Sequence, residues 1–153
     1  MQNLGHGHYE PLPVSYFPPF YIAYRRNLSE GTEVVHNNLR ARFDIGEPLV
    51  LEAMQRWAAI TDEFRQAMFG NDFVSMHNLM NENFDLRRKT VAISPGNIEL
   101  VELARSTGAS AKFTGSGGAI IGIYRDDDMF INLKTLMDKH EIEVIKPDIV
   151  GNS

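Results

Sequence analysis

Residues 111–124 read AKFTGSGGAIIGIY, a glycine-rich turn between two short stretches that contain apolar side chains. The second stretch, residues 119–124, is rich in β-branched and aromatic side chains, which favour strands. Glycine tolerates positive φ and lets a second backbone or a ligand approach closely, so residues 114–118 suit a tight turn. The segment therefore predicts two strands, at 110–114 and 119–124, joined as a hairpin.

Two long amphipathic helices are predicted upstream of this hairpin. Apolar side chains recur every three or four residues over residues 49–69 and again over residues 73–84, the spacing of a helix with one buried face. Gly70 follows the first helix where a C-terminal glycine belongs, and Asn71 or Asp72 can cap the second. Because the link between them is so short, we expect the two helices to pack as an antiparallel hairpin.

The remaining segments place one sheet beside several helices. The predicted elements are a strand at 20–24, a short helix at 34–43, a helix at 94–108 capped by Ser94 and Pro95, a helix at 129–140 and a final strand at 141–146. Strands and helices do not alternate regularly along the chain. This order indicates an α+β fold with segregated layers.

Length, charge and composition exclude several classes of protein. The 153 residues suffice for one domain with a hydrophobic core, and the net charge of −5 argues against a nucleic-acid binder, which needs a basic surface. Cysteine is absent, so disulfides and thiolate metal sites are excluded. No apolar run reaches the roughly 18 residues that cross a membrane. We therefore expect no membrane or nucleic-acid partner and a cytoplasmic location.

The turn residues Thr114, Gly115, Ser116, Gly117 and Gly118 are open to two interpretations. Successive backbone N–H groups in such a turn can form an anion-binding nest, or the glycines can serve hairpin geometry alone. No lysine follows the glycines, which excludes a Walker A loop, and the turn leads into a strand, which excludes a dinucleotide-binding fingerprint. His6 and His8 lack a third ligand nearby, so no metal site is predicted.

A resemblance to a known family selects between these interpretations. Residues 97–124, NIELVELARSTGASAKFTGSGGAIIGIY, resemble the third conserved motif of the GHMP kinases, and residues 79–88, LMNENFDLRR, resemble another helix of that family. Within the family, the ordered segments resemble plant-type glucuronokinases. These segments are LGHG at 4–7, His36 with Arg40 and Arg42, NFDLRR at 83–88 and KFTGSGGA at 112–119.

The resemblance implies a domain organisation. Residues 20–148 are expected to form a GHMP kinase C-terminal domain, a ferredoxin-like sheet of about four antiparallel strands with helices packed on one side. Residues 1–19, rich in Gly and Pro, are expected to form an extended arm, and residues 149–153 a tail. The family's N-terminal domain, which supplies the phosphate loop, the Mg²⁺ ligands and the catalytic Asp, has no counterpart in the sequence. We therefore expect no catalytic residue in this chain, and the missing domain as its partner.

The resemblance also implies a reaction, the ATP- and Mg²⁺-dependent phosphorylation of D-glucuronate at C1. The complete enzyme would need ATP and Mg²⁺, and this chain alone would bind neither. Residues 114–118 would support the transferring phosphate or the sugar. The substrate carboxylate suits Arg, whose guanidinium grips it bidentately, and the candidates are Arg40, Arg42, Arg87 and Arg88. The competing interpretation is that these arginines form surface ion pairs with acids such as Glu82 or Asp85.

Two alternatives remain open. The chain can be a stand-alone, non-catalytic module that binds a ligand or a protein and forms a homodimer through the surface left by the missing domain. Within the same family, the substrate can also be another sugar or a mevalonate-type compound. The genomic sequence upstream of Met1 and a substrate panel distinguish these alternatives.

Overall fold

The structure, a computed structural model, describes residues 14–26, 39–114 and 118–147. Residues 1–13 of the predicted arm lie outside these ranges. Residues 27–38, which follow the first strand, and the predicted tail at 149–153 also lie outside them. A short 3-10 turn, η1 (Val14–Tyr16), precedes the first strand.

The sheet has four antiparallel strands, as predicted. They are β1 (Phe20–Arg25), β2 (Lys112–Phe113), β3 (Ala119–Ile123) and β4 (Ile142–Ile145). Their order is β2-β3-β1-β4, with Ile22 of β1 opposite Ile121 of β3 and Ile145 of β4. This order, with helical connections after β1 and β3, is the ferredoxin-like arrangement. The quoted segment therefore forms the hairpin β2–β3 at one edge of the sheet.

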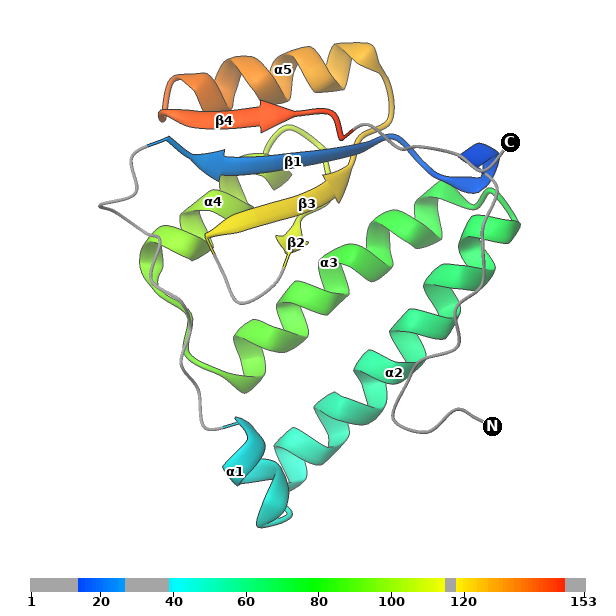
Figure 1. The fold of residues 1–153 in the computed structure, drawn as a ribbon, viewed down its shortest axis with the longest axis vertical. Coiled ribbons are helices and arrows are strands. Elements are labelled where there is room, and N and C mark those ends of the chain that lie inside the picture. Colours follow the sequence, from blue (N-terminus) through cyan, green and yellow to red (C-terminus); the bar gives the residue numbers. More distant parts are fainter. Residues whose placement is uncertain (1–13, 27–38, 115–117, 148–153) are drawn as a thin grey trace.

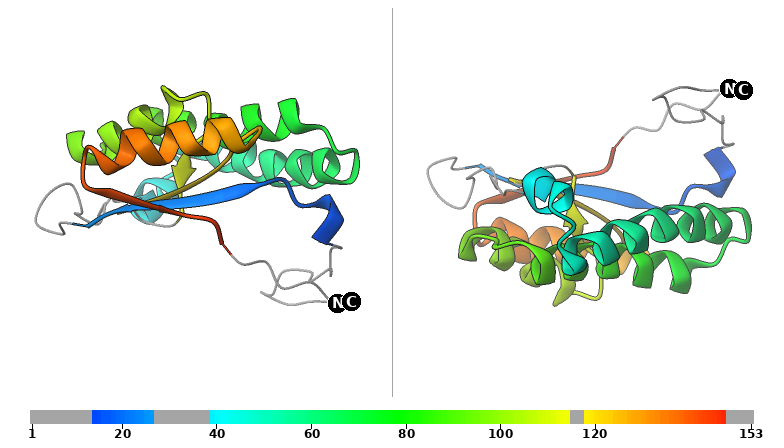
Figure 2. Two further views of the ribbon diagram at one scale, coloured as in Figure 1. Left: turned by 90° about the horizontal axis from the view of Figure 1, so that it is seen from above. Right: turned by 90° about the horizontal axis from the view of Figure 1, so that it is seen from below.

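The described residues form five α-helices beside the sheet. They are α1 (Leu39–Asp44), α2 (Pro48–Phe69), α3 (Phe73–Thr90), α4 (Pro95–Arg105) and α5 (Asp127–Asp138). Helices α2 and α3 form the predicted antiparallel hairpin (Figure 1). Helices α3, α4 and α5 lie on one side of the sheet (Figure 2). At one end of the other side, Phe20 and Ile121 pack against side chains of α2 and α3, and the open part of that side lies around Tyr24 and Ile145.

Most helix boundaries follow the predicted caps. The side chain of Ser94 accepts a hydrogen bond from the backbone N–H of Asn97, and that of Asp72 accepts one from Ser75. Asp126 accepts from the N–H of Met129, so α5 begins two residues before the predicted start at 129. Helix α1 begins at Leu39, and residues 34–38 of the predicted helix at 34–43 lie outside the described chain.

The core lies between the sheet and the three helices on its covered side. Its fully buried side chains come from every strand and from α3, α4 and α5; the largest are Tyr21, Phe84, Leu100, Ile120, Leu133, Met137, Ile142 and Val144. On the open side, Tyr24 and Ile145 are 39% and 41% exposed. The alternation of buried and exposed side chains along β1 and β4 follows the period of two that a one-sided sheet requires.

One close backbone approach holds the edge hairpin against the central strand. The hydroxyl of Tyr21 donates a hydrogen bond of 2.6 Å to the carbonyl of Ser110, and the backbone N–H of Ile123 donates one of 2.9 Å to the Ser110 hydroxyl. Between these groups passes Gly122, where an added Cβ would lie 1.8 Å from the Ser110 carbonyl oxygen. Only glycine fits this position.

We expect Gly122→Ala to destabilise the protein by at least about 3 kcal/mol, because the clash is with backbone atoms and rearrangement of a buried strand is needed to relieve it. Chemical denaturation monitored by far-UV circular dichroism measures this loss. The matched control is Gly70→Ala, since a Cβ at Gly70 would have its nearest neighbour at 3.6 Å. Equal stability of the two variants would contradict the close approach.

Candidate functional site

Two adjoining cavities lie beside the helical hairpin and share Asn83. The first, of about 280 Å³, has apolar walls from β1, β3, α2 and α3 and a polar lining of Thr61, Asn83 and Lys112. The second, of about 310 Å³, is lined by Leu39, Trp57, Asn83, Arg87 and Val91. Each volume is close to the lower end, about 300 Å³, of the range for small-ligand pockets. Together they form the candidate site.

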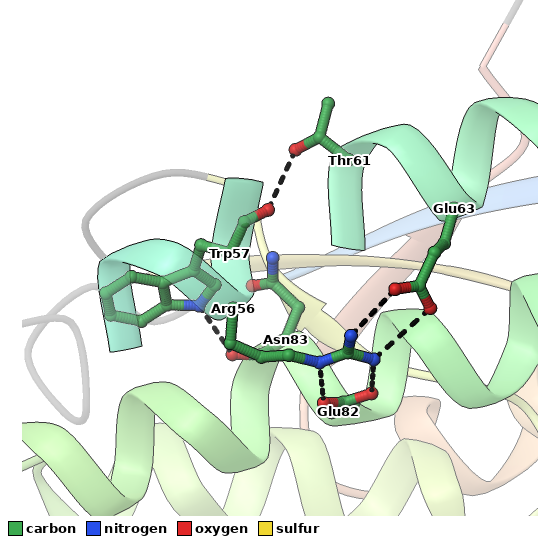
Figure 3. A network of polar contacts seen from close by, with 6 residues as sticks. All are labelled: Arg56, Trp57, Thr61, Glu63, Glu82 and Asn83. Atoms are coloured by element: carbon green, nitrogen blue, oxygen red, sulfur yellow. Dashed lines mark hydrogen bonds and ion pairs between the residues drawn. The ribbon is translucent and has the colours of Figure 1, made fainter. Parts of the chain in front are cut away.

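A polar network on α2 and α3 fixes the wall of this site (Figure 3). The Arg56 guanidinium of α2 donates hydrogen bonds of 2.7 Å to Glu82 of α3 and to Glu63 of α2. The indole N–H of the next residue, Trp57, donates a hydrogen bond of 3.3 Å to the backbone carbonyl of Asn83. These bonds hold the two helices in register, so that Trp57 and Asn83 lie side by side.

Lys112 brings a positive charge into the first cavity. Its Nζ donates a hydrogen bond of 3.1 Å to the carbonyl of Phe113, and no acidic side chain of the described residues forms an ion pair with it. Burial lowers the pKa of Lys112, and the nearby positive charge of Arg87 lowers it further. The surroundings therefore disfavour the charged form of this lysine.

Arg87 is the one predicted carboxylate candidate that lines a described cavity. Its Cζ lies 5.0 Å from the centre of the Phe113 ring, and burial lowers its pKa. Its neighbour on the helix, Arg88, points instead toward α4, where it lies 3.4 Å from a Glu102 carboxylate oxygen.

The other two arginine candidates are held by partners near α1. Arg40 is exposed and forms an ion pair with Asp44. Arg42 bonds to Glu47 and donates 2.9 Å to the carbonyl of Thr90. The structure thus separates the four candidates rather than gathering them into one site.

The predicted surface pairing with Glu82 and Asp85 takes a different form. These two acids bind Arg56 and Arg105, respectively, rather than any of the four candidate arginines. Arg40, Arg42 and Arg88 form ion pairs with other acids, Asp44, Glu47 and Glu102.

Two of the five turn residues lie in the described chain. The N–H of Thr114 donates 3.1 Å to the carbonyl of Ala119, which closes the hairpin. Gly118 has φ +87°, and its backbone N–H donates a hydrogen bond to the side-chain oxygen of buried Asn97, with 3.4 Å between nitrogen and oxygen. Gly115, Ser116 and Gly117 lie outside the described residues. The role of this turn in phosphate or sugar binding stays a prediction.

The strand before the turn is held by two side chains that the sequence did not single out. The Asn81 side-chain oxygen accepts a hydrogen bond of 2.9 Å from the N–H of Ala111. The Arg105 guanidinium donates a hydrogen bond of 3.1 Å to the carbonyl of Ala111 and one of 2.9 Å to the carbonyl of Asn81. Both polar groups of Ala111 are thereby bound, which sets the position of Lys112.

Lys112 and Asn83 are the functional candidates that sequence reasoning missed, since both were noted only as parts of motifs. The sequence does offer a signal for Lys112, because a charged side chain between Ala111 and Phe113 is unusual inside a short predicted strand. Trp57 and Phe64 belong to the predicted buried face of the helix at 49–69, and both are partly exposed. Phe64 packs against a core cluster and also lines the first cavity, and Trp57 lines the second.

Two other kinds of feature are absent from the described residues. No group of three His, Cys, Asp or Glu side chains among them could hold a metal ion, and His6 and His8 lie outside these ranges. No helix in the same ranges is long and apolar enough to cross a membrane.

Known proteins resemble this chain in sequence. The family model "GHMP kinases C terminal" matches residues 51–132, which confirms the predicted resemblance. The chain is 39% identical to Glucuronokinase 1 and 38% identical to Probable glucuronokinase 2 of Arabidopsis thaliana, each over 124 residues and 79% of this chain. It spans about a third of the length of these relatives, since the match covers 34% of each.

Solved structures resemble the fold. The L. major mevalonate kinase in complex with R-mevalonate matches with a TM-score of 0.69 and 17% identity, over 88% of this chain and 44% of that one. The Lin0012 protein from Listeria innocua matches with a TM-score of 0.69 and 18% identity, over 94% of this chain and 41% of that one. These likenesses confirm the predicted α+β fold.

Lys112 yields a test of the site's electrostatics. Because its folded pKa lies below its ordinary value of 10.5, the unfolded chain binds more protons between these two values, and stability rises with pH across that window. We therefore expect Lys112→Met to raise the melting temperature by a few degrees near neutral pH. The gain over the wild type should shrink as pH rises through the window.

Thermal unfolding of wild type and variant across this pH range measures the effect. The matched control is Lys89→Met, because Lys89 is exposed on α3, and its replacement should give no such pH-dependent gain. A stability difference between Lys112→Met and wild type that does not change with pH would contradict the unfavourable placement of the charge.

Proposed function

Since the chain belongs to the GHMP kinase family, of which it carries the C-terminal domain, we propose that it is the C-terminal part of a sugar kinase. The proposed reaction is ATP-dependent phosphorylation of D-glucuronate at C1, carried out when this part is joined to an N-terminal domain. The observation that carries the proposal is the sequence likeness to the two Arabidopsis glucuronokinases.

The described residues support a binding role for this part of the enzyme. Phosphoryl transfer is catalysed mainly by positioning the reactants and by neutralising the transferred charge. The chain offers two cations, Arg87 and Lys112, beside cavities with aromatic walls, which suits a sugar acid. We assign substrate-carboxylate binding to Arg87 ahead of Arg40, Arg42 and Arg88, because Arg87 alone of the four lines these cavities.

The remaining assignments follow the family. Thr114, Gly115, Ser116, Gly117 and Gly118 would support the transferring phosphate or the sugar. ATP supplies the phosphoryl group, and we place its Mg²⁺ ligands and the catalytic residue in the N-terminal domain. The proposal therefore gives this chain no Mg²⁺ ligand. A cytoplasmic location for the reaction is part of the same proposal.

A second candidate function rests on the open face of the sheet. Tyr24 and Ile145 are large, exposed and neighbours of half-buried Ile22 on that face. Such a face favours either docking of the N-terminal domain or pairing of two copies in a non-catalytic binding module. Sedimentation of the isolated chain, as monomer or dimer, distinguishes the two.

The kinase proposal is tested with a hybrid protein. The chain is joined to the N-terminal part of Arabidopsis Glucuronokinase 1 in place of that enzyme's own C-terminal part. We expect ATP-dependent formation of glucuronate 1-phosphate by the hybrid and none by either part alone. Turnover by this chain alone would contradict the proposal, as would a folded hybrid that phosphorylates D-glucose or mevalonate in preference to D-glucuronate.

Substitutions in the hybrid test the residue assignments. Arg87→Lys should raise the KM for D-glucuronate at least about tenfold, since Lys cannot replace a bidentate contact, and should leave the KM for ATP unchanged. Gly117→Val should lower kcat at least about tenfold, because it adds a bulky side chain to the turn to which we assign support of the transferring group. Arg125→Lys, at an exposed arginine outside these cavities, is the control.

Unchanged constants in Arg87→Lys would remove Arg87 from the site. A Gly117→Val hybrid with unaltered kcat and KM values would reduce the turn to a hairpin of geometric importance only.

A further inference from the structure

Lys112 differs from the other lysines of the described chain in having an enclosed charge without an acidic partner. Lys134 and Lys146 lie within ion-pair distance of Glu143 and Asp127, and Lys89 and Lys139 are exposed. The one hydrogen-bond partner of Lys112 among the described residues is the carbonyl of Phe113, at 3.1 Å. A charged lysine in this environment costs folding free energy. Burial removes water from the ammonium group, and one hydrogen bond to a neutral carbonyl compensates for only a small part of the lost hydration.

A second cation increases that cost. Arg87 lies close enough to Lys112 to repel its charge, and both side chains flank the same strand residue, Phe113. Arg87 belongs to the helical row that also carries Asn83, one turn earlier on α3. The two cavities meet at Asn83, so the site presents Lys112 on one side of that residue and Arg87 on the other.

Asn83 adds a hydrogen-bonding group between the cations. Its backbone carbonyl accepts from Trp57, while its side-chain amide forms no hydrogen bond within the described part of the chain. An amide lining a cavity in this way can donate to an oxygen of a ligand. The three side chains together offer two positive charges and a neutral donor beside two cavities that share Asn83.

We propose that Lys112, together with Arg87 and Asn83, binds the oxyanion group of a ligand that occupies the two cavities lined by Asn83. An oxyanion would give Lys112 a charged partner that the described residues do not supply. The apolar and aromatic walls formed by Phe20, Phe64 and Trp57 would contact the uncharged body of the ligand.

The position of Lys112 is prepared before any ligand arrives. Ala111, the preceding residue, is bound through both its N–H and its carbonyl by Asn81 and Arg105, and Arg105 is itself paired with Asp85 at 2.7 Å. Such preorganisation reduces the entropy lost on binding. Asn81 and Arg105 are therefore positioning residues, because they act on the ligand through Lys112.

Two ligand groups share the required chemistry, the carboxylate of a sugar acid and the phosphate of a nucleotide. The proposal deepens the proposed function and rests on it for the choice of these two. It assigns a binding residue, Lys112, that the arginine candidates do not include. Its test measures binding without turnover, so failure of binding and failure of the kinase hybrid are separate results.

The test uses the 153-residue chain and three probes, sodium D-glucuronate, sodium tripolyphosphate and D-glucose. Calorimetry and amide NMR shifts measure binding at low ionic strength, where an anion site is least screened. We expect one or both anions to bind, with shifts at Lys112, Asn83 and Arg87, and no binding of D-glucose. Preference for glucuronate identifies a carboxylate site, and preference for tripolyphosphate identifies a phosphate site.

Variants separate Lys112 from general charge effects. Lys112→Gln should weaken anion binding at least about tenfold, whereas Lys112→Arg should retain most of it because the charge is kept. Lys89→Gln makes the same charge change at an exposed site on α3 and should bind as the wild type does. If Lys112→Gln folds poorly, Lys112→Arg and the ligand-induced rise of the Lys112 pKa, followed by NMR, carry the test.

Three results would overturn the proposal. They are the absence of anion binding by the wild-type chain, equal losses in Lys112→Gln and Lys89→Gln, and binding of D-glucose as tight as that of D-glucuronate with no tripolyphosphate binding. An unchanged Lys112 pKa in the presence of a bound anion would likewise place the anion elsewhere.

Discussion

The buried contact among Tyr21, Ser110 and Gly122 is the constraint on which the edge of the sheet depends. The Tyr21 side chain reaches across β3 to the Ser110 carbonyl, and the absence of a Cβ at Gly122 makes room for that approach. Burial raises the pKa of the Tyr21 phenol, so the group stays protonated and remains a donor. This contact holds together the central strand β1, the strand β3 and the segment between α4 and β2, and its close packing leaves little room for movement.

A second set of polar contacts, next to that edge, positions the side chains of the candidate site. Asn81 and Arg105 bind Ala111, directly after the Ser110 contact, and place Lys112 beside the helical hairpin. Arg56 and Trp57 bind α2 to α3 and place Asn83 opposite it. The site combines a rigid frame with two cations, Lys112 and Arg87, whose charges repel each other. Under the binding role that we propose, this arrangement lowers stability in exchange for binding.

How much of the site could be predicted from sequence depends on the residue. The motif at 111–124 identified the hairpin and the family, because glycine and β-branched spacing act locally. It could not rank Arg40, Arg42, Arg87 and Arg88, which look alike in sequence. Their different partners, Asp44, Glu47, the Phe113 ring and Glu102, come from four separate parts of the chain. Lys112 was overlooked because its distance from the acidic side chains of the described residues depends on the tertiary structure.

The sequence by itself determined most helices, their caps, the antiparallel hairpin of α2 and α3 and the α+β class. These features follow from periodicity, capping side chains and short links, each of which acts within a few residues. The family was identified separately, by the resemblance of motifs such as residues 97–124 to those of known proteins. Only the tertiary structure decided which side chains share a cavity, since residues 57, 83, 87 and 112 meet through packing between elements. Burial and mutual repulsion of charges also arise there, because both depend on distances that the order of residues does not contain.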